Sequence, residues 1–299
     1  MPFWLIVVIA AHLLNAVAFL VDKYLLARAV PKPAVYAFYV GLLGSLGILA
    51  LPFDWQLPSG GQWVLDGAAG ATFVIALLCF FGALKRGEAS RIVPYVGGTI
   101  PIWTFVLAYL FLGERLAAPA LFAFIVLVAG SALITREGGR GGERKRHAYT
   151  MASLSAIAFA VTAVLMKAVF TEQSFLAGFA WTRVGATIAA LAILLHAPSR
   201  RAIVQPAARP RGSTAGLFIA GQGAGALGFF ALQYAISVAS PTIINALQGV
   251  QYAFLFLFAV FFGGRFPQLR ERLNRRIISG KIISMVLIAI GLALLAAGA

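Results

Sequence analysis

Residues 92–112 read IVPYVGGTIPIWTFVLAYLFL, a run of 21 residues without a charged side chain. A helix of about 20 apolar residues spans the roughly 30 Å hydrocarbon core of a bilayer. Comparable runs recur along the whole chain. The expected spans are 3–21, 33–53, 63–84, 92–112, 116–135, 150–170, 175–196, 213–235, 241–262 and 277–297. The sequence therefore predicts an all-α membrane protein with ten transmembrane helices.

The composition separates this chain from water-soluble proteins. Of its 299 residues, 61% are hydrophobic and 11% are charged, and the mean hydropathy is +0.93. An average soluble domain is about half apolar and about a quarter charged. An outer-membrane barrel would alternate apolar and polar residues over segments of about ten, and these runs do not alternate. The single cysteine, Cys79, lies in the third expected span, so cysteine spacing supports no disulfide or zinc site, and we expect no cofactor or metal.

The end of the run at 92–112 is repeated later in the chain. Tyr109-Leu-Phe-Leu-Gly-Glu-Arg-Leu116 recurs as Ala259-Val-Phe-Phe-Gly-Gly-Arg-Phe266 at an offset of 150, and earlier in each half the offset is 144. Because one copy holds five spans, an odd number, the two copies enter the membrane from opposite sides. We therefore expect two inverted repeats, residues 1–137 (helices one to five) and 149–299 (helices six to ten), joined by a basic cytoplasmic linker at 138–148. A duplication retained for stability alone is the alternative.

The basic residues predict an orientation in the membrane. Of 24 Lys and Arg residues, 21 fall in or beside the odd-numbered connections between spans. Lys and Arg accumulate in cytoplasmic loops, so both termini are predicted to be extracytoplasmic, in a multi-pass protein of a bacterial inner membrane. Basic loops facing an anionic leaflet also account for the formal charge of +15 without a nucleic-acid partner.

These residues resemble a known family. Gly82-Ala-Leu84, Glu88-Ala-Ser90, Pro101 and Phe111-Leu-Gly-Glu-Arg-Leu116 are similar to the EamA domain of the drug/metabolite transporter superfamily. The resemblance implies a ten-helix bundle, a central cavity lined by helices one, three, four, six, eight and nine, and export or exchange of amino acids or similar metabolites. Two departures limit it. Gly264 replaces the equivalent of Glu114, and many members are thought to keep both termini in the cytoplasm, against the loop charges here.

Polar side chains within the spans are the candidates for substrate binding. In helix nine, Asn245, Gln248 and Gln251 or Tyr252 follow three or four residues apart and share one helical face. Their amides can join neighbouring helices or bind a zwitterionic ligand. The glycines of residues 221–228 allow either close helix approach or a bend at a ligand. The remaining candidates are Asn15, Tyr95, Thr99, Trp103, Trp181, Arg183, Gln222 and Tyr234.

Charged residues near or within the spans are candidates for gating and coupling. Arg183 lies inside helix seven, where a charge is costly and marks either a substrate site or a structural contact. Lys23 and Lys167 occupy equivalent repeat positions and are candidate gates. No acidic residue is expected at the middle of a span, so Asp22 and Glu88 are the carboxylates left for proton coupling. Proton coupling, exchange and simple facilitation all remain open, as does the oligomeric state, although a monomer is sufficient.

The leading functional hypothesis is a secondary transporter that exports or exchanges a small organic metabolite, an amino acid or similar amphipathic compound, by alternating access. The first alternative is an exchanger of anionic, phosphorylated or nucleotide-linked metabolites that are neutralised by Arg183 and the two lysines. The second is a lipid-handling membrane protein without an aqueous cavity. The three histidines, including His12 in the first span, form no cluster with acidic residues or cysteine, so we do not expect an enzyme.

Overall fold

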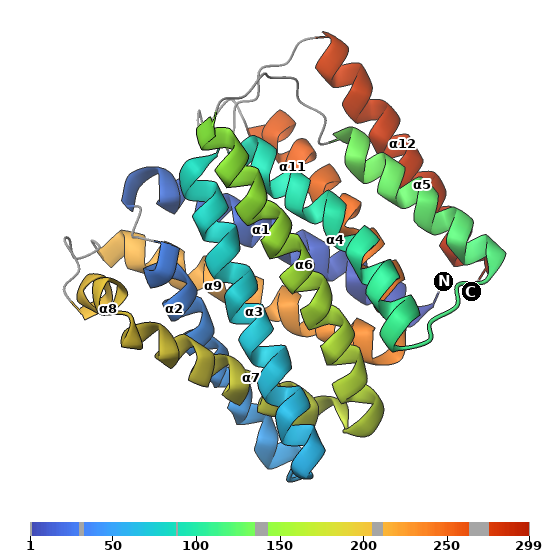
Figure 1. The fold of residues 1–299 in the computed structure, drawn as a ribbon. Helices are drawn as coiled ribbons and strands as arrows, with labels where there is room; N and C mark the ends of the chain where they lie inside the picture. Colours follow the sequence, from blue (N-terminus) through green and yellow to red (C-terminus); the bar gives the residue numbers. More distant parts are fainter. Residues whose placement is uncertain are drawn as a thin grey trace. The chain divides into compact units, whose positions relative to one another are not determined.

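The computed structural model describes residues 2–29, 33–87, 89–134, 143–204, 212–262 and 275–298, and within these ranges every regular element is helical. Figure 1 labels most of these elements. In chain order they are α1 (Phe3–Ala29), α2 (Pro33–Leu43), the 3₁₀ helix η1 (Gly44–Phe53), α3 (Gly60–Arg86), α4 (Ala89–Phe111), α5 (Ala118–Ile134), α6 (Glu143–Glu172), α7 (Phe175–Ala192), η2 (Ile193–Leu195), α8 (Ala197–Val204), α9 (Gly212–Val238), α10 (Pro241–Ala246), α11 (Gln248–Phe262) and α12 (Arg275–Gly298).

Six segments of the described chain have the length and hydropathy of membrane spans. They are Phe3–Val21, Pro33–Phe53, Gly60–Arg86, Arg146–Glu172, Phe175–Leu195 and Pro241–Phe258. Three shorter apolar helices accompany them, at Tyr95–Phe111, Ala118–Leu133 and Ile282–Ala297. The expected all-α, multi-pass membrane character is thus confirmed. The total of ten spans stays a prediction.

Several helix boundaries differ from those expected. The span at 33–53 changes from α2 to the tighter η1 at Gly44, and the span at 241–262 is divided at Leu247 between α10 and α11. The stretch after residue 197, expected to be a loop, begins with the short helix α8, and α6 begins at Glu143, inside the expected linker. These differences arise because a hydropathy window records apolar length and not helix continuity.

The chain folds as two compact units, each assembled from distant parts of the sequence. The first unit contains residues 1–30, 115–139 and 210–299, and the second contains residues 31–114 and 140–209. The first unit therefore holds α1, α5 and α9 to α12, whereas the second holds α2 to α4 and α6 to α8 with η1 and η2. Both units combine helices from the two halves of the sequence.

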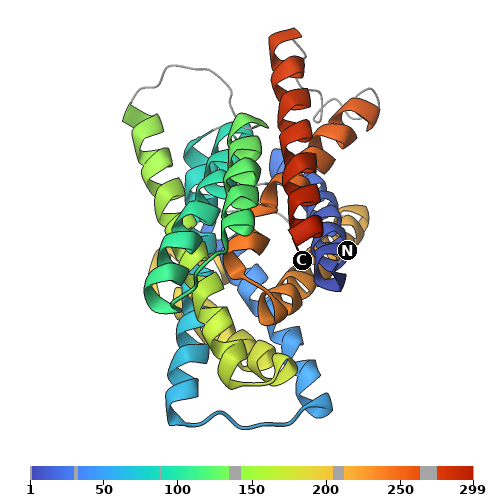
Figure 2. The same cartoon turned by 90° about the vertical axis from the view of Figure 1, so that its right-hand side faces the viewer.

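In the first unit, α1 packs along α9, α5 packs along α12, and α11 contacts both α1 and α5. The α5 and α12 pair lies side by side in Figure 1 and in Figure 2. Glycines allow these close crossings. A Cβ added at Gly291 of α12 would lie 2.6 Å from Leu127 Cγ on α5. Small residues at such crossings let backbones approach in a membrane, where packing supplies the attraction between helices.

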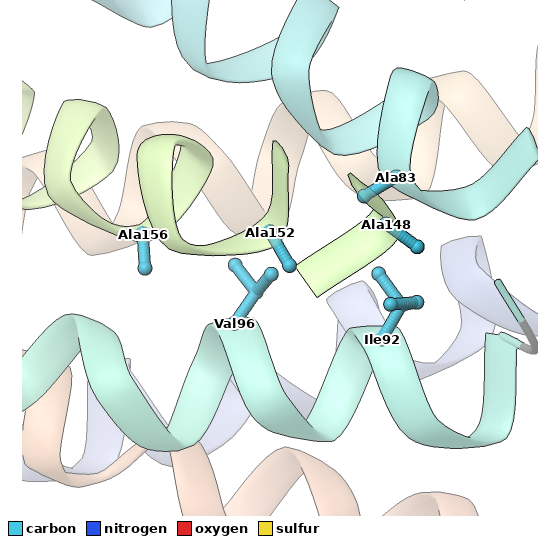
Figure 3. Close-up of a cluster of buried hydrophobic side chains, with 6 residues drawn as sticks. All are labelled: Ala83, Ile92, Val96, Ala148, Ala152 and Ala156. Atoms are coloured by element: carbon cyan, nitrogen blue, oxygen red, sulfur yellow. The ribbon is translucent and has the colours of Figure 1, made fainter. Parts of the chain in front are cut away.

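In the second unit, α3 is the central helix, because it packs against α6, α7 and α2. A cluster of small and branched side chains fills the junction of α3, α4 and α6, as Figure 3 shows. Its members are Ala83, Ile92, Val96, Ala148, Ala152 and Ala156. The alanines of α6 recur every four residues on one face, so α4 can approach α6 closely.

The repeated glycine after the fourth span ends α4. Gly113 has φ +65°, a left-handed conformation that glycine adopts without steric cost. The N–H of Glu114 donates to the carbonyl of Ala108 at 3.1 Å, and that of Leu112 donates to the same carbonyl at 3.0 Å. This arrangement is typical of a glycine-terminated helix, and it explains why glycine stands at this point of the motif.

Candidate functional site

The amide stripe expected on helix nine forms a partly buried hydrogen-bonded pair in the first unit. Gln248 Nε2 donates to Gln251 Oε1 at 2.8 Å, and Gln251 is 8% exposed. The stripe does not follow one regular helix, however, because Asn245 belongs to α10 and Gln248 is the first residue of α11. Tyr252, the residue that follows Gln251, is buried, and Asn245 is half-buried.

Two other helices contribute buried polar groups to the same unit. His12 of α1 is 1% exposed and Gln233 of α9 is 5% exposed. The side chain of Gln251 approaches the His12 imidazole. Neither ring nitrogen of His12 completes a hydrogen bond within the described residues, and neither does Gln233 Oε1. The sequence predicts no site role for His12, and the signal for a polar role is its place in the middle of the first span.

Three glycines of residues 221–228, namely Gly221, Gly225 and Gly228, lie at the close approach of α9 to α1. A Cβ at Gly228 would lie 2.5 Å from Asn15 Oδ1, and one at Gly221 would lie 2.5 Å from Val21 Cγ1. Asn15 therefore lies at the crossing of α1 and α9. At one end of this helix pair, the rings of Phe3 and Tyr234 meet edge to face at 6.4 Å, while Gln222 is half-buried in α9.

The aromatic candidates of α4 belong to the second unit. The Tyr95 hydroxyl is 2.8 Å from Ser153 Oγ, and its ring meets Tyr149 at 5.1 Å. Thr99 Oγ1 donates to the carbonyl of Tyr95 in its own helix at 2.7 Å. Trp103 is 40% exposed. Tyr95 thus joins α4 to α6, whereas Trp103 lies on the surface of its unit.

Trp181 lies with two other tryptophans in the second unit. Its Nε1 donates to the carbonyl of Gln56 at 2.7 Å. Its ring meets Trp63 at 4.8 Å and Trp55 at 6.2 Å. Trp181 therefore holds the connection between η1 and α3 against α7.

Arg183 of α7 is enclosed by apolar groups, with 3% of its surface exposed. Its guanidinium carbon lies 4.9 Å from the centre of the Phe73 ring and 5.4 Å from that of Phe179. Its stem passes under η1, where a Cβ at Gly47 would lie 2.6 Å from Arg183 Cγ. A cation placed over aromatic faces is attracted to them, so this setting stabilises the charge within the unit.

The structure adds a buried carboxylate near the start of the span formed by α3, and the expectation of no acidic residue at the middle of a span is unaffected. Asp66 is 1% exposed and lies in the second turn of α3. Both of its carboxylate oxygens are 3.1 Å from Gln173 Nε2, in the connection between α6 and α7. The sequence missed it because Asp66 stands close to the start of its span and resembles an interfacial residue.

Of the four gating and coupling candidates, the structure describes the side chain of Lys167 alone. Lys167 is half-buried in α6, and the Glu114 carboxylate is near enough to interact with it electrostatically. Asp22 and Lys23 are residues of α1, but their side chains are not among those that the structure describes. Glu88 lies outside the described residues. Their roles remain predictions.

Comparison with known proteins finds likenesses in family, sequence and fold. Residues 2–136 match the EamA-like transporter family. A Sinorhizobium protein named "Uncharacterized transporter in cobO 3'region" is 31% identical over 90 residues, a match that covers 29% of this chain and 63% of the relative. A protein known from a crystal structure, described without a function, aligns with a TM-score of 0.71 at 19% identity over 97% of this chain and 95% of its own.

Proposed function

We propose that the chain is a member of the EamA-like transporter family, which its residues 2–136 match, and that it is a secondary transporter. It exports or exchanges a small organic metabolite, an amino acid or similar amphipathic compound, by alternating access. The observation that carries this proposal beyond membrane transport in general is the Gln248 and Gln251 pair in the first unit. Amide side chains supply both donors and acceptors, which suit the ammonium and carboxylate groups of a zwitterion.

The pairing of helices supports an architecture of ten spans in two inverted repeats. Under the offsets of 144 and 150, α1 corresponds to α6, α3 to α9, and α4 to α10 with α11. In the second unit, α6 packs against α3 and α4; in the first unit, α1 packs against α9 and α11. These are equivalent pairings. Each of them joins one helix from one half of the sequence to two helices from the other half, as expected for interlocked inverted repeats.

The orientation and location follow from charge. The basic connections face the cytoplasm under the positive-inside rule, which makes both termini extracytoplasmic in a bacterial inner membrane. In Figures 1 and 2 the marks for the two termini lie near each other in the first unit, an arrangement that suits an even number of spans. Accessibility of a cysteine introduced at Ser59, in a C79S background, to a membrane-impermeant reagent on intact cells would test the orientation.

The main test is flux in proteoliposomes loaded with a panel of labelled amino acids. We expect saturable counterflow for at least one member. Gln248→Leu should raise the half-saturating concentration about tenfold or more, because losing one hydrogen bond to a charged group costs about 1.5–3 kcal/mol. Gln56→Leu makes the same chemical change at an exposed residue whose side chain bonds Asp54 and should leave flux unchanged. A reconstituted protein with no saturable flux for any amino acid would overturn this substrate class.

Arg183 keeps one alternative in view, the exchange of an anionic metabolite. A buried guanidinium is suited to phosphate or carboxylate recognition. Under this alternative, Arg183→Gln abolishes flux of phosphorylated compounds. Under the leading proposal, the same variant retains amino-acid flux in proportion to the amount of folded protein.

A further inference from the structure

The buried histidine of the first unit lies at the end of a short chain of side chains. His12 of α1 is 1% exposed and is approached by the Gln251 side chain. Gln251 Oε1 in turn accepts a hydrogen bond from Gln248 Nε2 at 2.8 Å. An amide oxygen has two lone pairs, so Gln251 Oε1 can accept a second hydrogen bond from a ring N–H of His12. A neutral imidazole carries one such N–H and a protonated imidazole carries two.

The imidazole also has unused hydrogen-bonding capacity. Neither His12 Nδ1 nor His12 Nε2 completes a hydrogen bond within the described residues. An enclosed polar group without a partner is costly, and an ionisable residue within a membrane span is by default a candidate for an ion or proton pathway. Because 1% of the residue is exposed, only a very small species such as a proton can bind the imidazole in this state.

The surroundings of His12 contain no opposing charge from the helices packed on α1. These helices are α9 and α11. By sequence their ionisable side chains are Tyr234 on α9 and Tyr252 on α11, and neither helix carries Asp, Glu, Lys or Arg. On α1 itself the nearest formal charges are Asp22 and Lys23, about 15 Å along the helix at 1.5 Å per residue. Protonation of His12 would therefore place a positive charge where the packed helices α9 and α11 carry no charged side chain.

The other end of the chain of side chains lies at an interruption of the helix. Gln248 is the first residue of α11, and α10 ends at Ala246. The N–H of Val250 bonds to the carbonyl of Leu247 at 2.9 Å in a tight turn. Broken helices in transporters are places where a local change of hydrogen bonding is tolerated and used.

We propose that His12 is the proton-binding group of this protein, and that its protonation adds a competing donor to Gln251 Oε1, which weakens the hydrogen bond between Gln248 and Gln251 at the start of α11. This inference rests on the proposed transport function. On proton uptake from water, both ring nitrogens become donors. The charged ring then donates to Gln251 Oε1, the atom that already accepts from Gln248 Nε2. Loss of the proton restores the arrangement seen here, and the bound proton leaves with no other bond made or broken.

The first experiment compares two modes of transport in proteoliposomes. Counterflow at equal pH on both sides reports substrate movement alone, whereas accumulation driven by a pH gradient reports coupling. A gradient of one unit corresponds to about tenfold accumulation for one proton per substrate. We expect the native protein to show both modes and His12→Gln to lose the driven accumulation while keeping counterflow. His147→Gln changes an exposed histidine and should keep both. Equal driven accumulation by the native protein and His12→Gln would overturn the proposal while leaving the transport function intact.

The second experiment needs no substrate and no variant. Hydrogen exchange of residues 245–252 is measured by mass spectrometry from about pH 8 down to about pH 3.5, a range that includes and extends below the pH at which an exposed histidine changes charge, and is corrected for the intrinsic pH dependence. We expect faster corrected exchange at the acidic end in the native protein. Gln251→Leu, which interrupts the chain of side chains, should abolish this pH response. Identical corrected exchange across the range in the native protein would overturn the proposal, even if no transport substrate were found.

Discussion

Gln173 Nε2 lies 3.1 Å from each carboxylate oxygen of Asp66, so one amide ties the second turn of α3 to the connection between α6 and α7. The carboxylate is 1% exposed. A buried charged group depends on its hydrogen bonds, and this contact therefore couples two distant parts of the second unit.

The first prediction concerns this contact. Asp66→Ala should lower the free energy of unfolding by about 1–3 kcal/mol, because it leaves the Gln173 amide without its acceptor. Gln173→Ala should cost at least as much, because it leaves a buried charge. The double variant should cost less than the sum by about 1 kcal/mol or more. Chemical unfolding in detergent measures all three, and strictly additive costs would show that the two residues do not interact.

The second prediction concerns the crossing of α3 and α7. A Cβ at Gly70 would clash with Ala186 N and lie 2.5 Å from the carbonyl of Thr182. Backbone atoms cannot move aside as a flexible side chain can, so Gly70→Ala should destabilise the protein by about 1–3 kcal/mol. Gly67→Ala, on the same helix, has nothing within 4 Å of the added Cβ and should be neutral or slightly stabilising. Equal thermal stability of the two variants would contradict this view of the crossing.

The third prediction concerns the enclosed arginine. Arg183→Lys keeps the charge but removes the flat guanidinium that lies over Phe73 and Phe179. Arginine and lysine are not equivalent at stacked sites, and we expect Arg183→Lys to lower the free energy of unfolding by about 1 kcal/mol. Arg200→Lys, at an exposed position of α8, is the matched control and should have no effect. The midpoint of thermal unfolding in detergent gives the comparison, and an unchanged midpoint for Arg183→Lys would rule out a stabilising role for the stacking.

The fourth prediction concerns the end of α4. Gly113 has φ +65° and nothing within 4 Å of an added Cβ, so substitution there changes backbone strain alone. Gly113→Ala should lower the free energy of unfolding by about 1 kcal/mol. Gly113→Asn should lower it less, because asparagine tolerates this conformation. Gly61→Ala also adds a Cβ in open space and serves as the control. The same unfolding assay decides, and a loss for Gly61→Ala equal to that for Gly113→Ala would exclude the backbone explanation.

The sequence by itself determined the helical membrane character and the glycine that ends α4. Apolar run length is a local property of the chain, and so is the conformational freedom of Gly113. The repeated motif could likewise be found by comparing the chain with itself.

Only the tertiary structure decided which polar groups are buried and which residues they contact. Asp66 is covered because residues more than 100 positions away fold over it, and His12 meets Gln251 because α11 packs on α1. The interruption at Leu247 also breaks the regular face that the spacing of Asn245 and Gln248 had predicted. Burial depends on neighbours supplied from elsewhere in the chain, so no local pattern distinguishes an enclosed Asp66 or His12 from a residue at the membrane interface.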